Sequence, residues 1–175
     1  MTAPRVLLLI PPLTQLNTPY PSTAYLTGFL QSRGIACEQA DLGIEMVLRL
    51  FSRDGLRQVF GLVRQQYEDL PAQALALLEE EQAYIDSIET VVAFLQGKHP
   101  NAAAQLIRPG VLPRGPRFHG KTRLKRSVSV EDRAKHWSTL YLEDLTDLVQ
   151  ATICPFFALS RYAEHLAHSA SSFDR

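Results

Sequence analysis

The sequence has few cysteines, no long apolar run and no excess of charge, and each absence excludes a class of protein. Its two cysteines, Cys37 and Cys154, stand far apart in 175 residues, so no disulfide framework forms and a reducing compartment is expected. The most apolar run, residues 6–10, is too short to cross a membrane or to form the core of a signal peptide. We therefore predict a cytoplasmic protein that does not insert into membranes.

The formal net charge is zero, so no whole-chain field recruits nucleic acid. Residues 108–126 are the only hint of a nucleic-acid partner, because no acidic residue occurs between Glu89 and Glu131. This basic segment either is a solvated loop balanced by acidic helices, which is the favoured interpretation, or contacts RNA phosphates or an acidic cofactor tail with Phe118 as an aromatic face. Its Lys and Arg residues are Arg108, Arg114, Arg117, Lys121, Arg123, Lys125 and Arg126.

Catalytic and metal-binding motifs are also missing from the sequence. It has no Gly-rich phosphate loop, no Gly-x-Ser-x-Gly and no zinc spacing. His165 and His168 stand one helical turn apart and can bind a metal if Glu164 joins them, but a solvated pair is the favoured interpretation. Cys37 is expected in a strand core, and Cys154 has no activating group beside it. We predict neither a catalytic residue nor a metal site in this chain.

What is present begins with a strand, a stiff loop and a helix. Residues 6–10 (Val-Leu-Leu-Leu-Ile) end at two prolines and are typical of a parallel strand buried on both faces. Two further prolines, Pro19 and Pro21, stiffen the polar loop that follows. Ser22 or Thr23 is expected to cap the next helix, which ends at Gly34. Its expected apolar face consists of Tyr25, Leu26, Phe29 and Leu30.

Residues 35–40 are predicted to form a second strand, which ends at Asp41. Strand, helix and strand make one right-handed βαβ unit. In such sheets ligands bind outside the carboxyl ends of the strands. The loop at residues 11–21 and the Asp41 side chain are therefore expected at the ligand edge.

These residues carry a resemblance to a known family. Residues 11–21 (Pro-Pro-Leu-Thr-Gln-Leu-Asn-Thr-Pro-Tyr-Pro), with the helix, Arg33-Gly34 and Asp41 that follow, resemble the start of the cobalamin-binding-like domain that precedes the catalytic barrel in radical S-adenosylmethionine (SAM) proteins. Residues 134–145 resemble a later helix of the same subgroup. The resemblance implies a helix-rich α/β fold with a partial flavodoxin- or Rossmann-like parallel sheet. The cofactor-binding residues expected from it and from the ligand edge are Pro12, Thr14, Gln15, Asn17, Thr18, Tyr20 and Asp41.

Cobalamin is rich in amides and suits the neutral polar side chains of this loop, although they can instead satisfy the loop backbone. Asp41 has two interpretations as well, a ligand contact or the cap of the next helix, and the cap is favoured. The sequence lacks the Asp-x-His-x-x-Gly motif that supplies the lower axial ligand of cobalt. Any cobalamin would have to bind without that ligand.

The sequence also lacks the Cys-x-x-x-Cys-x-x-Cys motif of radical enzymes. A 4Fe-4S cluster and S-adenosylmethionine are therefore expected only in a longer parent protein. The function predicted from the resemblance is an N-terminal accessory domain without a complete catalytic site. Its expected partner is the rest of a radical SAM polypeptide or a second copy in a homodimer. The alternative is a non-enzymatic helical interaction module on a flavodoxin-like remnant.

Four regions are expected along the chain: the βαβ unit (1–43), a helical region (44–108), a basic Pro/Gly-rich loop (109–130) and a second helical region (131–175). In the last region the acidic side chains, including Asp144, are expected to lie opposite the apolar helix face or beside it. A new helix is expected to start at Pro155. A first apolar stripe runs through Leu56, Val59, Phe60, Val63, Tyr67 and Leu70, and a second through Leu75, Leu78, Ile85, Ile88, Val92 and Leu95. Two strands cannot complete a doubly wound sheet, so either another stretch of this chain is a strand or further strands lie beyond Arg175. The family resemblance favours the second alternative.

Overall fold

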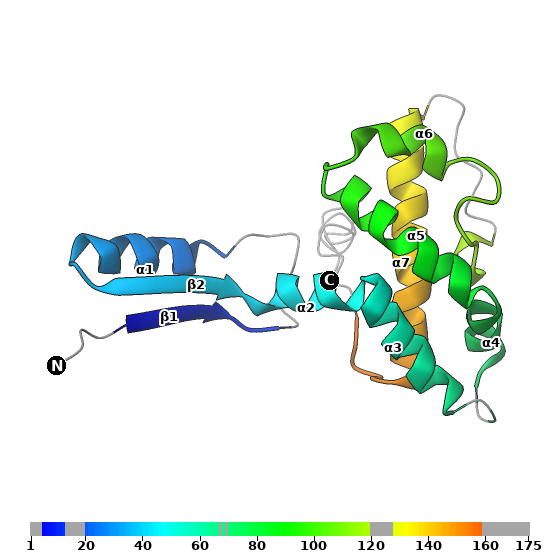
Figure 1. Ribbon diagram of the computed structural model, residues 1–175, viewed down its shortest axis with the longest axis horizontal. Helices are drawn as coiled ribbons and strands as arrows, with labels where there is room; N and C mark the ends of the chain where they lie inside the picture. The colour runs from blue at the N-terminus through cyan, green and yellow to red at the C-terminus, as the bar shows by residue number, and fades with distance from the viewer. Residues whose placement is uncertain (1–4, 13–19, 67, 69, 120–127, 159–175) are drawn as a thin grey trace, which may run out of the picture. The chain divides into compact units, whose positions relative to one another are not determined.

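A computed structural model describes residues 5–12, 20–66, 68, 70–119 and 128–158 of the chain. The described residues divide into two units, one up to Val47 and one from Leu48. Two parallel strands lie in the first unit together with helical segments, and the second unit is mostly helical (Figure 1). The predicted helix-rich α/β fold class is confirmed.

The first unit is the predicted strand–helix–strand. It contains β1 (Arg5–Ile10), α1 (Pro21–Ser32), β2 (Ala36–Asp41) and the start of α2 (Leu42–Leu50). The helix α1 begins at Pro21 because proline suits the first helical position, and its N-cap Tyr20 makes no side-chain bond. The expected cap at Ser22 or Thr23 is therefore wrong. Gly34 has a φ of +72° and turns the chain from α1 into β2.

The strands β1 and β2 pair in parallel, and Leu7 lies opposite Glu38. Side chains alternate between the two faces of a sheet. Helix α1 packs on the sheet, where Val6, Leu8 and Ile10 are half-buried. Leu7 and Leu9 on the other face are 59% and 48% exposed. The expectation that both faces of β1 are buried is wrong, because in the described part of this unit a helix covers only one face.

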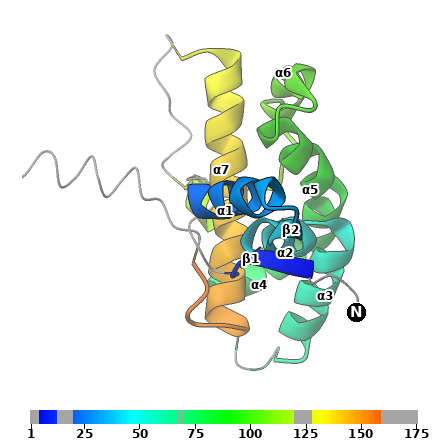
Figure 2. The ribbon, with the colours of Figure 1, turned by 90° about the vertical axis from the view of Figure 1, so that its left-hand side faces the viewer.

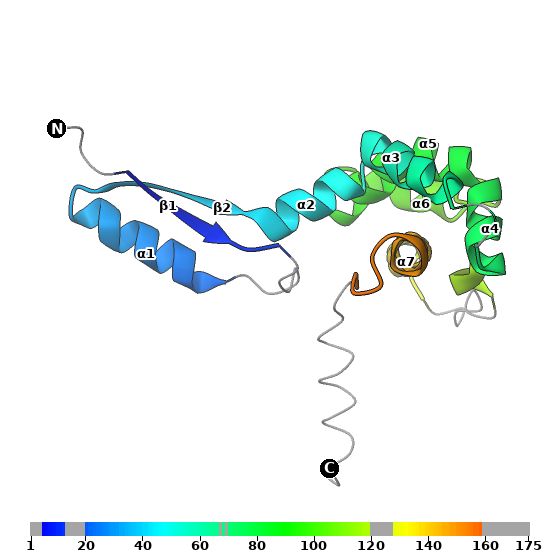
Figure 3. The same cartoon turned by 90° about the horizontal axis from the view of Figure 1, so that it is seen from below.

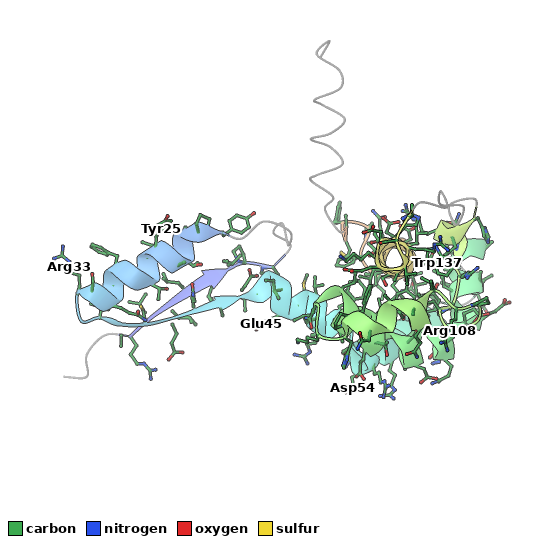
Figure 4. The ribbon with its side chains drawn as sticks, turned by 90° about the horizontal axis from the view of Figure 1, so that it is seen from above. Tyr25, Arg33, Glu45, Asp54, Arg108 and Trp137 are labelled. Carbon is green, nitrogen blue, oxygen red and sulfur yellow. The ribbon has the colours of Figure 1, made fainter. Side chains whose placement is uncertain are left out.

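Helix α1 also turns a different side to the sheet than expected. Its half-buried residues are Thr23, Thr27 and Leu30, and the Thr27 carbonyl accepts a hydrogen bond from the Cys37 thiol (3.5 Å). Figure 4 shows Tyr25 on the side of α1 away from the strands, where it is 79% exposed. Of the predicted apolar face only Leu30 is partly covered, and Tyr25, Leu26 and Phe29 are exposed.

The second unit is helical. Its elements are α3 (Arg53–Arg64), α4 (Ala72–Glu79), α5 (Glu81–Leu95), η2 (Pro100–Ala102), α6 (Ala103–Leu106), η3 (Pro116–Phe118) and α7 (Val130–Thr152). Helix α7 contacts α4, α5, α6 and η3. Figure 2 shows α5 and α7 side by side, and Figure 3 looks along α7 toward the helices packed against it. The core of this unit therefore surrounds α7.

Ser52 and Gly55 explain why α3 starts where it does. The Ser52 hydroxyl accepts a hydrogen bond from the Gly55 N–H (3.1 Å), so Ser52 is the N-cap of α3. Gly55 lies so close to the Arg49 carbonyl that an added Cβ would be 2.2 Å from its oxygen. Val59, Phe60 and Val63 then bury the predicted apolar face of α3.

The second apolar stripe of the sequence was expected to be continuous, but Glu80 interrupts it and α5 starts anew. The restart shifts the face that α5 buries. In α4 the core contains Leu77 and not the predicted Leu75 and Leu78. In α5 it contains Val91 and Phe94 and not the predicted Val92 and Leu95. At the end of the described chain, residues 155–158 are not helical, so a helix does not begin at Pro155.

Candidate functional site

The carboxyl ends of both strands meet at the predicted ligand edge, where Ile10 pairs with Asp41. The Asp41 Oδ1 accepts a hydrogen bond from the Ile44 N–H (3.0 Å), which confirms that Asp41 caps α2. Its carboxylate is half-buried and can still accept a bond through Oδ2. The two roles considered for Asp41 are therefore compatible.

Two further predicted residues flank this edge. Pro12 follows β1 and is exposed, and Tyr20 precedes α1 and is 40% exposed. The other predicted residues, Thr14, Gln15, Asn17 and Thr18, lie outside the described residues. The described part of the edge thus offers one carboxylate acceptor between apolar side chains, which suits a ligand with amide N–H groups. None of its described site residues is a histidine, so it offers no imidazole for cobalt.

A buried polar cluster lies in the second unit, and the sequence analysis missed it. Asp144 of α7 is 1% exposed. Its Oδ1 accepts a hydrogen bond from the backbone N–H of Arg117 (2.8 Å), and its Oδ2 accepts one from the Tyr84 hydroxyl (3.3 Å). The expectation that Asp144 lies opposite or beside the core is wrong, because it shares a helix face with Tyr141, Leu145 and Leu148. A lone acid among apolar residues on that face was the available signal.

The cluster ties three elements together. The Tyr141 hydroxyl donates to the Tyr84 carbonyl of α5 (2.7 Å), and the two rings pack at 4.9 Å between centroids. Arg117 of η3 holds Asp147 of α7 with two guanidinium N–H groups, one of them 2.6 Å from Oδ1. The cluster therefore fastens η3 and α5 to α7.

Burial dominates the electrostatics of these groups. It raises the pKa of Asp144 to about 6, although the hydrogen bonds from Arg117 and Tyr84 oppose the rise. Burial also raises the pKa of Tyr84, and the neighbouring Asp144 charge adds to that rise. The pKa of the Tyr141 hydroxyl is raised by burial as well. The hydrogen bond to Asp147 raises the pKa of Arg117.

Space around Asp144 is very limited. A Cβ added to Gly115 would lie 2.6 Å from the Asp144 carboxylate and 2.5 Å from Leu77 Cδ2. Beside Pro116, Asp144 and Asp147 a cavity of about 30 Å³ remains, which is enough for about one water molecule. The cluster cannot admit a substrate, and we assign it a structural role.

The basic segment is partly packed into this unit. Phe118 is 3% exposed and its ring meets Trp137 edge-on at 6.5 Å. The proposed aromatic face for RNA at Phe118 is therefore wrong. Arg117 is paired with Asp147, and residues 120–127 lie outside the described residues. Arg108 and Arg114 remain exposed.

Among the described residues, the remaining candidates offer no reactive site. Cys37 and Cys154 are half-buried free cysteines, and His165 and His168 lie outside the described residues. Across the described ranges, no three His, Cys, Asp or Glu side chains group closely enough to bind a metal ion. Nor does any described helix combine the length and apolar character needed to span a membrane.

Comparison with protein-family models, curated proteins and solved structures finds no match to this chain. The resemblance to cobalamin-binding-like domains therefore depends on residues 11–41 and 134–145.

Proposed function

We propose that the first unit is the N-terminal part of a cobalamin-binding-like accessory domain of a radical SAM protein, and that this chain completes no catalytic site. One observation carries the proposal, namely that the unit has the start of a doubly wound sheet but only one covered face. Across the described residues, β1 and β2 pair only with each other. In a doubly wound fold such a sheet continues with further strands and helices.

The amino-acid pattern of β1 favours an interior position in a larger sheet. Residues 6–10 are all apolar, whereas β2 contains Glu38, Gln39 and Asp41. Strands that read as continuous apolar runs are typically covered on both faces. Leu7 and Leu9 would then pack against a helix of a further βα unit, and the free edge of β1 would pair with its strand.

The same proposal assigns the ligand to the carboxyl ends of the strands. Cobalamin, when bound, would supply the cobalt chemistry. Gln15 and Asn17 would hydrogen-bond its amide side chains, Thr14 and Thr18 would assist, and Asp41 would accept an amide N–H through Oδ2. Pro12 and Tyr20 would provide apolar surface beside the ring. A 4Fe-4S cluster and S-adenosylmethionine would belong to the parent protein, and a cytoplasmic location goes with this role.

The proposal is tested by incubating the chain with hydroxocobalamin and recording the absorbance spectrum after gel filtration. We expect corrin bands to co-elute with the protein and to disappear in the double variant Gln15→Ala, Asn17→Ala. The matched control is Asn101→Ala, Gln105→Ala, which removes two exposed amides from the second unit and should leave the bands unchanged. If neither this chain nor the full-length parent protein retains corrin, the cobalamin role is wrong.

A second candidate is a non-enzymatic interaction module. It is favoured by the exposed face of α1, where the Arg33 guanidinium lies 5.3 Å from the centre of the Phe29 ring and Tyr25 is 79% exposed. Aromatic residues and arginine are enriched at protein interfaces. The genomic sequence after Arg175 separates the candidates: Cys-x-x-x-Cys-x-x-Cys supports the radical SAM parent, and a stop codon supports the module.

A further inference from the structure

Unpartnered hydrogen-bond donors lie along one side of α7 in the second unit. Trp137 is 8% exposed, and its buried Nε1 has no hydrogen-bond partner among the residues that the structure describes. Arg133 precedes it by one helical turn on the same face. The Arg133 Nε is also buried and has no partner within the same described ranges. Because buried donors are almost always bonded, two such donors on residues one helical turn apart point to a missing acceptor.

A third donor group, Arg114, lies against the same tryptophan. Its guanidinium carbon is 4.4 Å from the centre of the Trp137 ring. A guanidinium group that stacks on an aromatic ring keeps its in-plane N–H groups available for an oxygen acceptor. Arg114 is exposed, so a ligand can reach that edge. One guanidinium group thus stacks on the indole, and a second, that of Arg133, belongs to the preceding turn of α7.

In the part of the chain that the structure describes, neither Arg114 nor Arg133 forms a salt bridge.

Two acids of α7 are already paired with cations, Glu131 with Lys135 (2.7 Å) and Asp147 with Arg117. Asp132 accepts a hydrogen bond from the Ser129 hydroxyl (2.7 Å) and forms no salt bridge among the described residues. A half-buried cation without a counter-charge, such as Arg133, is unfavourable unless an anion joins it.

We propose that Arg114 and Arg133 bind a phosphate group beside Trp137. The planar N–H forks of arginine match phosphate oxygens and hold them with two parallel bonds. Free phosphate and the phosphate of a nucleotide share this chemistry. The site lies in the second unit and does not depend on the cobalamin role proposed for the first.

The tryptophan provides a direct test, because it is the only one in the chain. Its indole N–H gives a single cross-peak in a proton–nitrogen correlation spectrum of the full 175-residue chain. The protein is titrated with sodium phosphate and separately with ATP, with sodium chloride keeping the ionic strength constant. We expect the peak to move and to saturate. Movement with both probes indicates free phosphate as a ligand, and saturation by ATP alone indicates a nucleotide.

Three variants make the test specific. Arg114→Gln and Arg133→Gln should each weaken binding at least tenfold. Arg108→Gln changes an exposed arginine, which Figure 4 labels, and should bind as tightly as the unmodified chain. If Arg133→Gln loses its helical circular dichroism, the exposed Arg114→Gln still decides. The proposal is overturned if neither probe moves the peak, if chloride moves it equally, or if Arg114→Gln retains full affinity.

Discussion

Asp144 is the single residue with the largest electrostatic consequence. Its pKa of about 6 lies above the ordinary value of 3.8, so the unfolded chain loses this proton at lower pH than the folded protein. The free energy of unfolding therefore falls as the pH rises from about 4 to 7. The difference between the two pKa values corresponds to about 3 kcal/mol.

Replacing this acid by its amide should remove the pH dependence. As the pH rises from 4 to 7, the free energy of unfolding of Asp144→Asn should increase by about 3 kcal/mol relative to that of the unmodified protein, because the amide stays neutral. Urea unfolding monitored by Trp137 fluorescence at the two pH values measures it. Asp86→Asn, which changes an exposed acid on α5, is the control. If the free energy of unfolding changes with pH equally in Asp144→Asn and in the unmodified protein, the pKa of Asp144 is not raised.

Gly115 illustrates a second residue-scale constraint. Gly115→Ala should destabilise the second unit by about 1–3 kcal/mol, because its Cβ would meet Leu77 Cδ2 at 2.5 Å. Gly61→Ala is the matched control, since nothing lies within 4 Å of the added Cβ in the middle of α3. Alanine favours the helix there and should stabilise it by about 0.5–1 kcal/mol. Urea unfolding should therefore show shifts of opposite sign, and equal shifts would contradict the close packing at Gly115.

At the scale of elements, the start of α3 depends on one side-chain cap. Ser52→Ala should lower the free energy of unfolding by about 1 kcal/mol, because it removes the acceptor for the Gly55 N–H. Ser52→Asp keeps an oxygen at that position and should restore most of the loss. Thermal unfolding measured by circular dichroism compares them. If the alanine and aspartate variants unfold together, the hydroxyl is not the cap that matters.

Elements were predictable where a local signal marks them. Pro11 and Gly34 mark the end of the first strand and of the first helix correctly, because these signals act within one turn of the chain. The faces that helices bury depend on partners distant in sequence. The periodicity of α1 could not tell that Leu30 lies toward the sheet while Tyr25 does not, and the break at Glu80 left no proline or glycine to reveal it.

The candidate site was predictable only in part for the same reason. Asp41 caps α2, which follows from a polar residue between a strand and a helix. The burial of Asp144 depends on Tyr84 and on the backbone of Arg117, both distant in sequence. A sequence pattern that scores aspartate as a surface residue cannot anticipate such a contact.

At the scale of the whole molecule, the two units differ in how much they bury. In the described residues of the first unit, only Gly43 is buried, whereas the second unit buries side chains such as Phe60, Ile88 and Leu145. Because apolar burial supplies most of the stability, the first unit should open far more often.

Hydrogen exchange tests this difference. We expect amides of β1 and β2 to exchange at least about 100-fold faster than those of α5 and α7. A ligand or partner that covers the first unit should slow β1 and β2 selectively. Equal protection in the two units of the isolated chain would mean that the first unit is stabilised by contacts not described above.

The close approach of Gly115 to Asp144 also has an evolutionary consequence. A methyl group at position 115 would need the space that the Asp144 carboxylate and Leu77 Cδ2 occupy. Among homologous sequences, a residue larger than glycine at position 115 should therefore occur together with smaller residues at both positions 144 and 77. Such correlated substitutions would be evidence for this contact that does not depend on any measurement on the protein itself.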